Sequence, residues 1–385
     1  PALSPALTPA PAISTRPTPY LALDVSHAVL RYRRLAAALP GTAVHYAVKA
    51  NPHPDLLRAL VAAGACFDVA SPAEVRACLE AGASTDDMVY SNPVKKREDI
   101  VESAALGVRL FVVDSVAETI KVADAAPGSA VLCRIVTSGC GSDWPLNRKF
   151  GCPESEAIEV LLTAAERGLD AAGVSFHVGS QQRDPQAWDA PIRTSARIFA
   201  TLRHLGLGPW LVDLGGGFPA SLEGDAPPLP AYAAAIECAL RRHFPLGRPR
   251  TLIEPGRGIV ADAGEVVATV IGVTDRGGQR WVYVDAGVFS GMVETLEEAV
   301  RYRLSSTATG ALAPCVLAGP TCDSADVLYE RVPVMLPCDL AEGDLVFFAA
   351  AGAYTTCYST VAFNGFAPMG TELIGRHITD LAVAQ

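Results

Sequence analysis

Lys49 is the residue whose type and position most clearly suggest chemistry. It follows a short β-branched and aromatic run, residues 44–48, and precedes a turn dipeptide, Asn51-Pro52. A strand ending on a lysine places the amine at a sheet or barrel edge, where burial is expected to lower its pKa and leave a neutral nucleophile. Such an amine attacks carbonyls and forms Schiff bases. Because most lysines are solvated surface groups, the rest of the chain must support this reading.

Two patterns after later apolar runs are suited to an anionic cofactor. Three glycines at 215–217 let backbone N–H groups approach a phosphate closely, with a flexible turn as the alternative. Glu254 ends the next run, and Arg257 follows three residues later. A carboxylate facing a ring nitrogen and a guanidinium facing a phosphate fit one cofactor, whereas a local ion pair at a turn is the competing explanation.

Other candidate groups are weaker when each is taken alone. His177, with Ser180 after it, could stack on a planar cofactor, although a lone strand histidine is more often a core residue. Cys322 and Asp323 pair a proton donor with an acceptor of cations, in a stretch otherwise expected to be a turn with a small buried cysteine. Tyr354 offers a phenol, more often a packing group than a ligand.

Strands and helices that would position these groups alternate between about residues 44 and 260. Eight apolar runs are expected to be strands: 44–48, 66–70, 88–91, 110–113, 131–135, 173–178, 211–214 and 251–254. Amphipathic helical stretches lie between them, such as 54–63, 72–81, 116–125 and 154–167. This alternation predicts an α/β fold, a (β/α)8 barrel, with a doubly wound open sheet as the alternative. In a barrel, the polar strand ends would meet at one face.

The pattern changes after residue 262. Runs at 265–274, 280–285, 314–317, 345–349 and 361–364 read as strands separated by Gly, Pro and Asp, and only 292–301 reads as a helix. We therefore expect a loose Pro- and Ala-rich arm at 1–18, a barrel domain at 19–262 and a mainly β domain at 263–385. The strand-like residues 19–24 are expected to join the β domain.

Composition excludes several functional classes. The 385 residues are 50% hydrophobic and 19% charged, which indicates a globular protein. A net charge of −10 disfavours nucleic acid, and apolar runs are too short for a membrane span. The ten cysteines include no C-x-x-C pair, so neither a zinc nor a redox site is predicted. The sequence shows no secretory apolar region, so we expect a cytoplasmic protein with reduced thiols.

Each of these motifs is a weak indicator alone, but the whole set in this order along the chain indicates one protein family. The chain resembles, over about residues 19–370, the pyridoxal-phosphate-dependent decarboxylases of the alanine-racemase-like barrel class, closest to the bacterial ornithine/lysine branch of the ornithine/lysine/arginine/diaminopimelate family. The resemblance is carried by the stretches at 46–51, 67–71, 176–180, 215–217, 254–257, 319–323, 352–354 and 363–366.

The resemblance implies how these residues would hold pyridoxal 5′-phosphate. Lys49 would carry the cofactor as a Schiff base, His177 would stack on its ring, and Glu254 would pair with the ring nitrogen. Asp68 and Arg134 would support the ring and the lysine. The phosphate side would be formed by Ser180, Gly215, Gly216, Gly217, Gly256, Arg257 and Tyr354.

The resemblance also implies a homodimer with shared active sites. Cys322, as proton donor, and Asp323, as the ligand of a distal cationic group, would reach the site from a second subunit. Related animal enzymes carry a Tyr-Asp pair in the β domain for the distal amine of the substrate; Glu294 is the nearest carboxylate to that position, so it is expected to bind substrate. The stretch 137–145 is unusual and would either reshape the pocket or lie outside it.

The implied activity is decarboxylation of a basic L-amino acid, ornithine or lysine, to a diamine. The alternatives are a specialised N-modified or biosynthetic diamino acid, or diaminopimelate, although Pro-Thr-Cys-Asp at 320–323 argues against diaminopimelate. A racemase on the same barrel is a weaker alternative because the motifs favour decarboxylation. A non-catalytic regulatory relative is also weaker, because Lys49, Glu254, Arg257 and Cys322 are intact.

Overall fold

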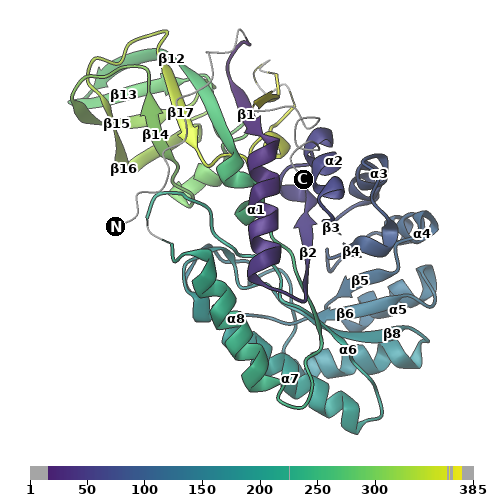
Figure 1. Ribbon diagram of the computed structural model, residues 1–385. Coiled ribbons are helices and arrows are strands. Elements are labelled where there is room, and N and C mark those ends of the chain that lie inside the picture. The colour runs from purple at the N-terminus through teal and green to yellow at the C-terminus, as the bar shows by residue number, and fades with distance from the viewer. Residues whose placement is uncertain (1–15, 225, 362–363, 365–366, 375–385) are drawn as a thin grey trace, which may run out of the picture.

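The structure, a computed structural model, describes residues 16–224, 226–361, 364 and 367–374. The predicted N-terminal arm lies largely outside these residues, as does most of the stretch 363–366. A closed eight-stranded barrel and a mainly β domain make up the described chain. Figure 1 shows the helices and strands of the barrel beside the β domain. The predicted (β/α)8 barrel with a C-terminal β domain is therefore confirmed, and the doubly wound open sheet is wrong.

The barrel strands all run parallel, in the order β10-β11-β2-β3-β4-β5-β6-β8. Seven of the eight predicted strands agree with the observed ones to within two residues at each end. The strands are β2 (Thr42–Ala47), β3 (Cys66–Val69), β4 (Met88–Tyr90), β5 (Leu110–Val113), β6 (Ala130–Arg134), β8 (Asp170–Ser175), β10 (Leu211–Asp213) and β11 (Arg250–Ile253).

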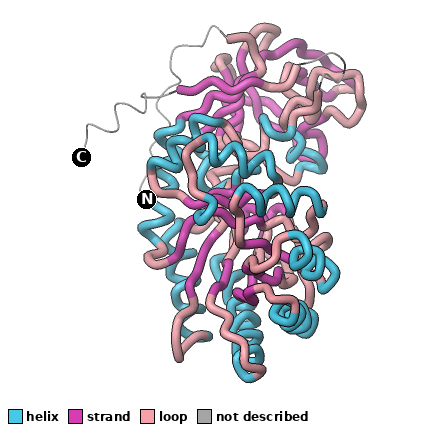
Figure 2. Tube along the Cα trace, turned by 90° about the vertical axis from the view of Figure 1, so that its right-hand side faces the viewer, coloured by secondary structure: helices cyan, strands magenta, loops and turns pink. Residues whose placement is uncertain are grey.

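Helices cover the outside of the barrel, as Figures 1 and 2 show. Two begin at serine N-caps: Ser71 accepts from the N–H of Glu74, and Ser115 accepts from that of Glu118. The helices are α1 (Val25–Ala38), α2 (Pro54–Ala62), α3 (Pro72–Glu80), α4 (Arg97–Leu106), α5 (Val116–Ala125), α6 (Glu154–Glu166), α7 (Asp189–His204), α8 (Leu229–His243) and the short α9 (Arg257–Val260). In the described chain, no helix is both long and apolar enough to cross a membrane.

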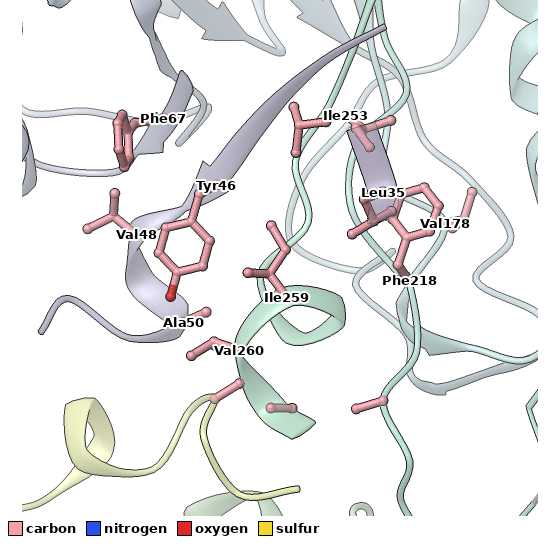
Figure 3. Packing of buried hydrophobic residues seen from close by; sticks show 14 of the residues in the cluster. Leu35, Tyr46, Val48, Ala50, Phe67, Val178, Phe218, Ile253, Ile259 and Val260 are labelled. Carbon is pink, nitrogen blue, oxygen red and sulfur yellow. The ribbon is translucent and has the colours of Figure 1, made fainter. Parts of the chain in front are cut away.

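Two layers of apolar packing fix the barrel. Inside it, strands contribute Val89, Val112, Leu132, Ala172, Leu211 and Leu252, which are almost fully buried. Outside it, a larger cluster fills the space between strands and helices; Figure 3 shows the part where Tyr46 and Ile253 face Ile259 and Val260 of α9. Because both faces of the strands are buried, they read as continuous apolar runs.

The β domain is an eight-stranded sheet that includes the first strand of the chain. β1 (Tyr20–Asp24) pairs antiparallel with β12 (Gly264–Arg276) and parallel with β18 (Gly370–Ile374). The other strands are β13 (Gln279–Val284), β14 (Arg303–Ser306), β15 (Leu312–Ala318), β16 (Val327–Pro337) and β17 (Leu345–Ala349).

Three local predictions are corrected by the structure. The predicted helix at 292–301 is instead a kinked 3-10 segment, η5 (Val293–Glu298), because Glu297 and Glu298 have positive φ and the Glu298 carboxylate accepts N–H groups of β16. The strand predicted at 173–178 is β8, which ends at Ser175, so His177 lies beyond it. Of the predicted strand at 361–364, the described Val361 and Asn364 are not in a strand.

Candidate active site

A cavity of about 390 Å³ lies at the carboxyl ends of the barrel strands. Predicted site residues from both domains line it: Lys49, Arg134, His177, Ser180, Gly217, Glu254, Gly256, Arg257, Glu294 and Tyr354. Asp68, Gly215 and Gly216 lie directly behind, against Lys49, His177 and Glu254. Residues that are far apart in sequence meet here because parallel barrel strands all end at one face.

The amine of Lys49 is held by a buried carboxylate. Lys49 lies in η1 (Val48–Ala50), immediately after β2, and its Nζ is 2.5 Å from Oδ2 of Asp68 at the end of β3. The Lys49 side chain is 45% exposed, whereas that of Asp68 is fully buried. Ser91, just after β4, donates its hydroxyl to the other Asp68 oxygen. Asp68 therefore has a fixed orientation and points the amine into the cavity.

The expected neutral state of Lys49 is not what this environment favours. Burial by itself lowers the pKa of the amine, but the Asp68 carboxylate, with Tyr354 and Glu254 nearby, raises it above the ordinary value of a lysine. The prediction of a neutral amine through burial is therefore wrong, because it did not include the buried acid. The nucleophile must lose a proton first, and Asp68 lies close enough to accept it.

His177 is neutral and packs against the glycine loop. Burial, with Arg134 and Lys49 nearby, lowers the pKa of His177 to about 3. Its Nδ1 accepts from the N–H of Gly179 at 3.0 Å. A Cβ on Gly216 would lie 2.9 Å from the imidazole Nε2 and 2.7 Å from the Glu254 carbonyl oxygen. Only glycine fits this close approach, so the loop brings its backbone directly beside the ring.

Glu254 is a buried acid next to another buried acid. Burial raises its pKa well above the usual value, and the charges of Asp213 and Asp68 add to this effect. Burial likewise raises the pKa of Asp213 to about 6, although Ser175 and the N–H of Gly215 donate to its carboxylate. A cationic group placed against Glu254 would relieve this crowding of acids.

Arg257 connects the two domains within the cavity. Its Nη2 donates to both carboxylate oxygens of Glu294, at 2.7 and 2.9 Å, and its Nε donates to the Ser180 hydroxyl at 3.2 Å. The guanidinium carbon lies 5.0 Å from the centre of the Tyr354 ring. Glu294, predicted to bind substrate, is thus engaged with Arg257, and its substrate role stays a prediction that requires this pair to open.

Two buried atoms in this cavity lack a hydrogen-bond partner among the described residues, namely Oε1 of Glu254 and Nη1 of Arg257. A free buried carboxylate oxygen and a free buried guanidinium N–H are costly unless a ligand satisfies them. A cofactor with a protonated ring nitrogen and a phosphate supplies both partners. The residues present therefore fit pyridoxal phosphate.

The stretch after β6 forms one wall of the cavity. Trp144, Pro145, Leu146, Arg148, Lys149 and Phe150 line it. β7 (Ser142–Trp144) pairs antiparallel with β9 (Ser180–Gln182), which carries Ser180. An ion pair between Asp143 and Arg183, at 2.6 Å, joins the same two segments. The unusual stretch at 137–145 thus ends in the pocket wall, and its Trp144 and Pro145 line the cavity.

Cys322 and Asp323 are not part of this assembly. Both are exposed in the loop after β15, and neither lines the cavity. The backbone N–H and the thiol of Cys322 contact Oδ1 of Asn364, at 3.4 and 3.5 Å. Asp323 accepts from the N–H of Ala325 within its own turn. One chain therefore holds the cofactor side of the predicted site without these two residues.

The sequence-based reasoning missed several contributors. The sequence assigned no role to Ser91, which donates to Asp68, or to Asp213, whose charge acts on Glu254. The pairing of Glu294 with Arg257 had no local signal, because 37 residues and a domain boundary separate them. Nor did any local signal show that Leu146 and residues 148–150 would line the pocket.

Comparisons with known proteins agree with this geometry. The family model described as "Pyridoxal-dependent decarboxylase, pyridoxal binding domain" matches residues 25–261. A lysine/ornithine decarboxylase of Selenomonas ruminantium is 36% identical over 352 residues, covering 91% of this chain and 88% of that protein. The crystal structure of a Vibrio vulnificus lysine/ornithine decarboxylase complexed with cadaverine is 36% identical, with a TM-score of 0.85 over 93% of this chain and 95% of that one.

The match of the family model covers more than half of the chain, and these relatives align with nearly all of it. The barrel, the lysine at its mouth and the paired acid and arginine are the parts such an enzyme needs. The chain belongs to the pyridoxal-dependent decarboxylases, enzymes that remove the carboxyl group of amino acids with pyridoxal phosphate as cofactor.

Proposed function

We propose that this enzyme decarboxylates a basic L-amino acid, ornithine or lysine, to the corresponding diamine. The observation that carries the proposal is the convergence of Lys49–Asp68, Glu254 and Arg257 on one cavity. Its relatives include lysine/ornithine decarboxylases, one of them solved with the diamine cadaverine. Pyridoxal phosphate supplies a ring that accepts the electrons left when the carboxyl group departs.

On the ring side, the proposed roles follow from charge and burial. Lys49 would hold the cofactor through its amine, and Asp68 would accept the proton that this amine must lose. Glu254, whose Oε1 has no hydrogen-bond partner among the described residues, would keep the ring nitrogen protonated, which would favour the charge that develops during reaction. Neutral His177 covers the ring face without adding a competing positive charge.

On the phosphate side, Arg257 would donate from its Nη1, which has no hydrogen-bond partner in the described part of the chain. Glu294 and Ser180 occupy its other donors and fix the guanidinium plane. The backbone of Gly217 and Gly256 and the phenol of Tyr354 complete the proposed phosphate site. Tyr354 lies against Gly256, where an added Cβ would be 2.9 Å from the phenol oxygen.

The substrate end requires a second copy of the chain in this proposal. The acids lining the cavity are Glu254 and Glu294, and both already have roles toward the cofactor. A distal ammonium group would therefore be held by Asp323, and the reacting carbon would be protonated by Cys322, both from the partner in a homodimer. Their exposure on the loop after β15 supports this arrangement, because they are accessible to another subunit.

A second candidate substrate carries a distal carboxylate, as diaminopimelate does. The observation that favours it is the presence of Arg148 and Lys149 among the lining residues. Cationic side chains beside the substrate would favour an anionic end group and disfavour an ammonium. The two candidate substrates would therefore be favoured by opposite charges on the side chains of this part of the pocket.

A substrate panel tests the proposal directly. Purified holoenzyme is given ornithine, lysine, arginine, diaminopimelate and N-modified diamino acids, and released CO2 and amine are measured. We expect the highest kcat/KM with ornithine or lysine. Release of CO2 from diaminopimelate alone would replace the proposed substrate class, and loss of optical rotation without CO2 would replace decarboxylation by racemisation.

Mixing two inactive variants tests the shared site. We expect Lys49→Ala and Cys322→Ala to lose nearly all product formation separately, since each removes a proposed catalytic group. After mixing and subunit exchange, hybrid dimers contain one intact site, so about a quarter of wild-type activity should return. Absence of recovery, with exchange verified by mass, would place Cys322 outside the partner's site.

A further inference from the structure

Lys95 is a buried lysine that the proposed chemistry does not use. It lies in the segment joining β4 to α4, and its side chain is fully buried. Its Nζ donates to three backbone carbonyls, those of Asn92 at 3.0 Å, Pro93 at 3.3 Å and Val112 at 2.6 Å. It also lies 3.3 Å from Oε1 of Glu118. A charge buried this completely is retained only where it is fully partnered.

The backbone of the same residue is fixed as well. The N–H of Lys95 donates to Oε1 of Glu118 at 3.1 Å, and its carbonyl accepts from Lys121 Nζ. Glu118 and Lys121 belong to α5, and Val112 belongs to β5. Lys95 therefore joins its own segment to the neighbouring strand and helix of the barrel.

This segment reaches the active site at its other end. Asn92 and Pro93, whose carbonyls Lys95 binds, line the cavity, and so does Ser91. Ser91 donates to Asp68, which in turn holds the Lys49 amine. A continuous set of contacts thus runs from the buried ammonium to both the pocket wall and the reacting lysine.

We propose that Lys95 is a positioning residue of this enzyme, whose ammonium holds residues 91–93 as a wall of the substrate pocket and as the support of Asp68. The proposal rests on the proposed use of the cavity for substrate. It assigns Lys95 no contact with substrate or cofactor. Its role is to keep a turn of irregular backbone in one conformation, since small displacements near reacting groups lower rates strongly.

The titration of Lys95 provides a readout that a merely structural residue would lack. Burial lowers its pKa to about 8, opposed by the carboxylate of Glu118; Lys121 lowers it further, and Asp114 raises it. Above pH 8 the ammonium loses a proton and one donor, so the wall loosens. The same deprotonation relieves the cost of burying a charge, so this group adds stability from pH 8 to the ordinary lysine pKa. As pH rises above 8, KM for the substrate should therefore increase while the free energy of unfolding also increases, so that substrate binding weakens as the fold becomes more stable.

The test compares Lys95→Met with Lys96→Met, its exposed neighbour, in the holoenzyme. In Lys95→Met we expect a rise in KM of about tenfold or more at pH 7, with visible cofactor absorption retained. For wild type we expect KM to rise between pH 7 and 9 as Lys95 loses its proton, and we expect this rise to be absent in Lys95→Met. Lys96→Met should match wild type in KM at pH 7 and in the change of KM between pH 7 and 9. Titration of the substrate or of Lys49 affects all three proteins equally, so it does not alter the comparison.

A second variant keeps the proposal testable if Lys95→Met does not fold. Glu118→Gln removes the charge that raises the Lys95 pKa, so the rise in KM should move to lower pH while the protein remains folded. An unchanged pH profile in Glu118→Gln, or a wild-type profile in Lys95→Met, overturns the proposal. Failure of the proposed function is distinguishable, because wild type itself would then release no CO2 from the panel.

Discussion

The two ends of the barrel hold cavities of nearly equal volume, about 390 Å³ at the carboxyl ends of the strands and about 380 Å³ at the amino ends. The amino-end cavity also contains charged and aromatic groups, including His45, Asp87, Arg109, Trp210 and Arg250. The volume of each cavity and the polarity of its lining therefore do not distinguish the two cavities.

The difference lies in how the polar groups are partnered. At the amino end, Cys66 donates to Asp87, Arg109 binds the carbonyls of Ala104 and Val108, and Arg250 stacks on Trp210 at 5.2 Å. At the carboxyl end, Glu254 and Arg257 each keep a buried atom without a partner in the described chain. A functional cavity is recognised by buried polar atoms that lack hydrogen-bond partners in the protein, because a bound ligand can supply those partners.

The largest effect should come from Lys49→Ala at the carboxyl end. Without the amine there is no covalent attachment of the cofactor, so activity and visible cofactor absorption should both disappear. Decarboxylation assays and absorption spectra of the purified protein measure this. A yellow, active Lys49→Ala enzyme would remove the basis for placing the chemistry in this cavity.

Glu254→Gln should lower kcat by about a hundredfold, since a neutral amide no longer keeps the ring nitrogen protonated as charge develops. Visible absorption should remain because Lys49 is intact. The folded state raises the pKa of Glu254, so its burial costs stability as pH rises above the ordinary glutamate value. Cofactor-free Glu254→Gln should therefore melt higher than cofactor-free wild type at pH 7, and a lower melting temperature would contradict this electrostatic account.

Glu294→Ala should weaken cofactor binding about tenfold, because Arg257 loses the carboxylate that fixes its plane. Titration of the cofactor-free protein with pyridoxal phosphate, followed by absorbance, gives the dissociation constant. A matched Glu297→Ala change alters a nearby acid of the same segment. If KM for the amino acid rises while cofactor affinity stays constant, the original assignment of Glu294 to substrate is the better one.

The smallest effect on catalysis should come from His45→Leu in the amino-end cavity, for which we expect unchanged kcat and KM. Burial lowers the pKa of His45 to about 4, so wild type loses stability as pH falls from 6.5 toward 4. That loss amounts to ~3 kcal/mol once the pH is below both values. Thermal melts at pH 7 and pH 4 should show less acid sensitivity in the variant, and reduced activity at pH 7 would mean that both cavities serve the reaction.

Sequence patterns predicted those parts of the molecule that depend on local order. Runs such as 110–113 and 116–125 gave the correct strand and helix bounds, since apolar periodicity and the Ser115 cap act within one element. Lys49, Glu254 and Arg257 could be predicted because each lies shortly after the carboxyl end of a strand. The charge state of Lys49 could not be predicted, because it depends on Asp68 from the neighbouring strand.

The sequence pattern at 292–301 predicted a helix wrongly, because contacts with a distant part of the chain determine the backbone there. An amphipathic helix is locally reasonable there, but the Glu298 carboxylate instead accepts the N–H groups of Glu330 and Arg331 and joins this segment to β16. The resulting kinked backbone carries Glu294 to Arg257. Tertiary contacts thus overrode local preference at a residue that lines the active site.

The pairing of β1 with β12 and β18 has a consequence for folding during synthesis. Residues 20–24 leave the ribosome long before their partners at 264–267 and 370–374. Until then the strand has unpaired N–H and C=O groups and apolar side chains such as Leu21 and Leu23, a state prone to aggregation. A chain terminated soon after residue 262 would keep this strand permanently unpaired. Premature termination should therefore yield insoluble material rather than a free barrel.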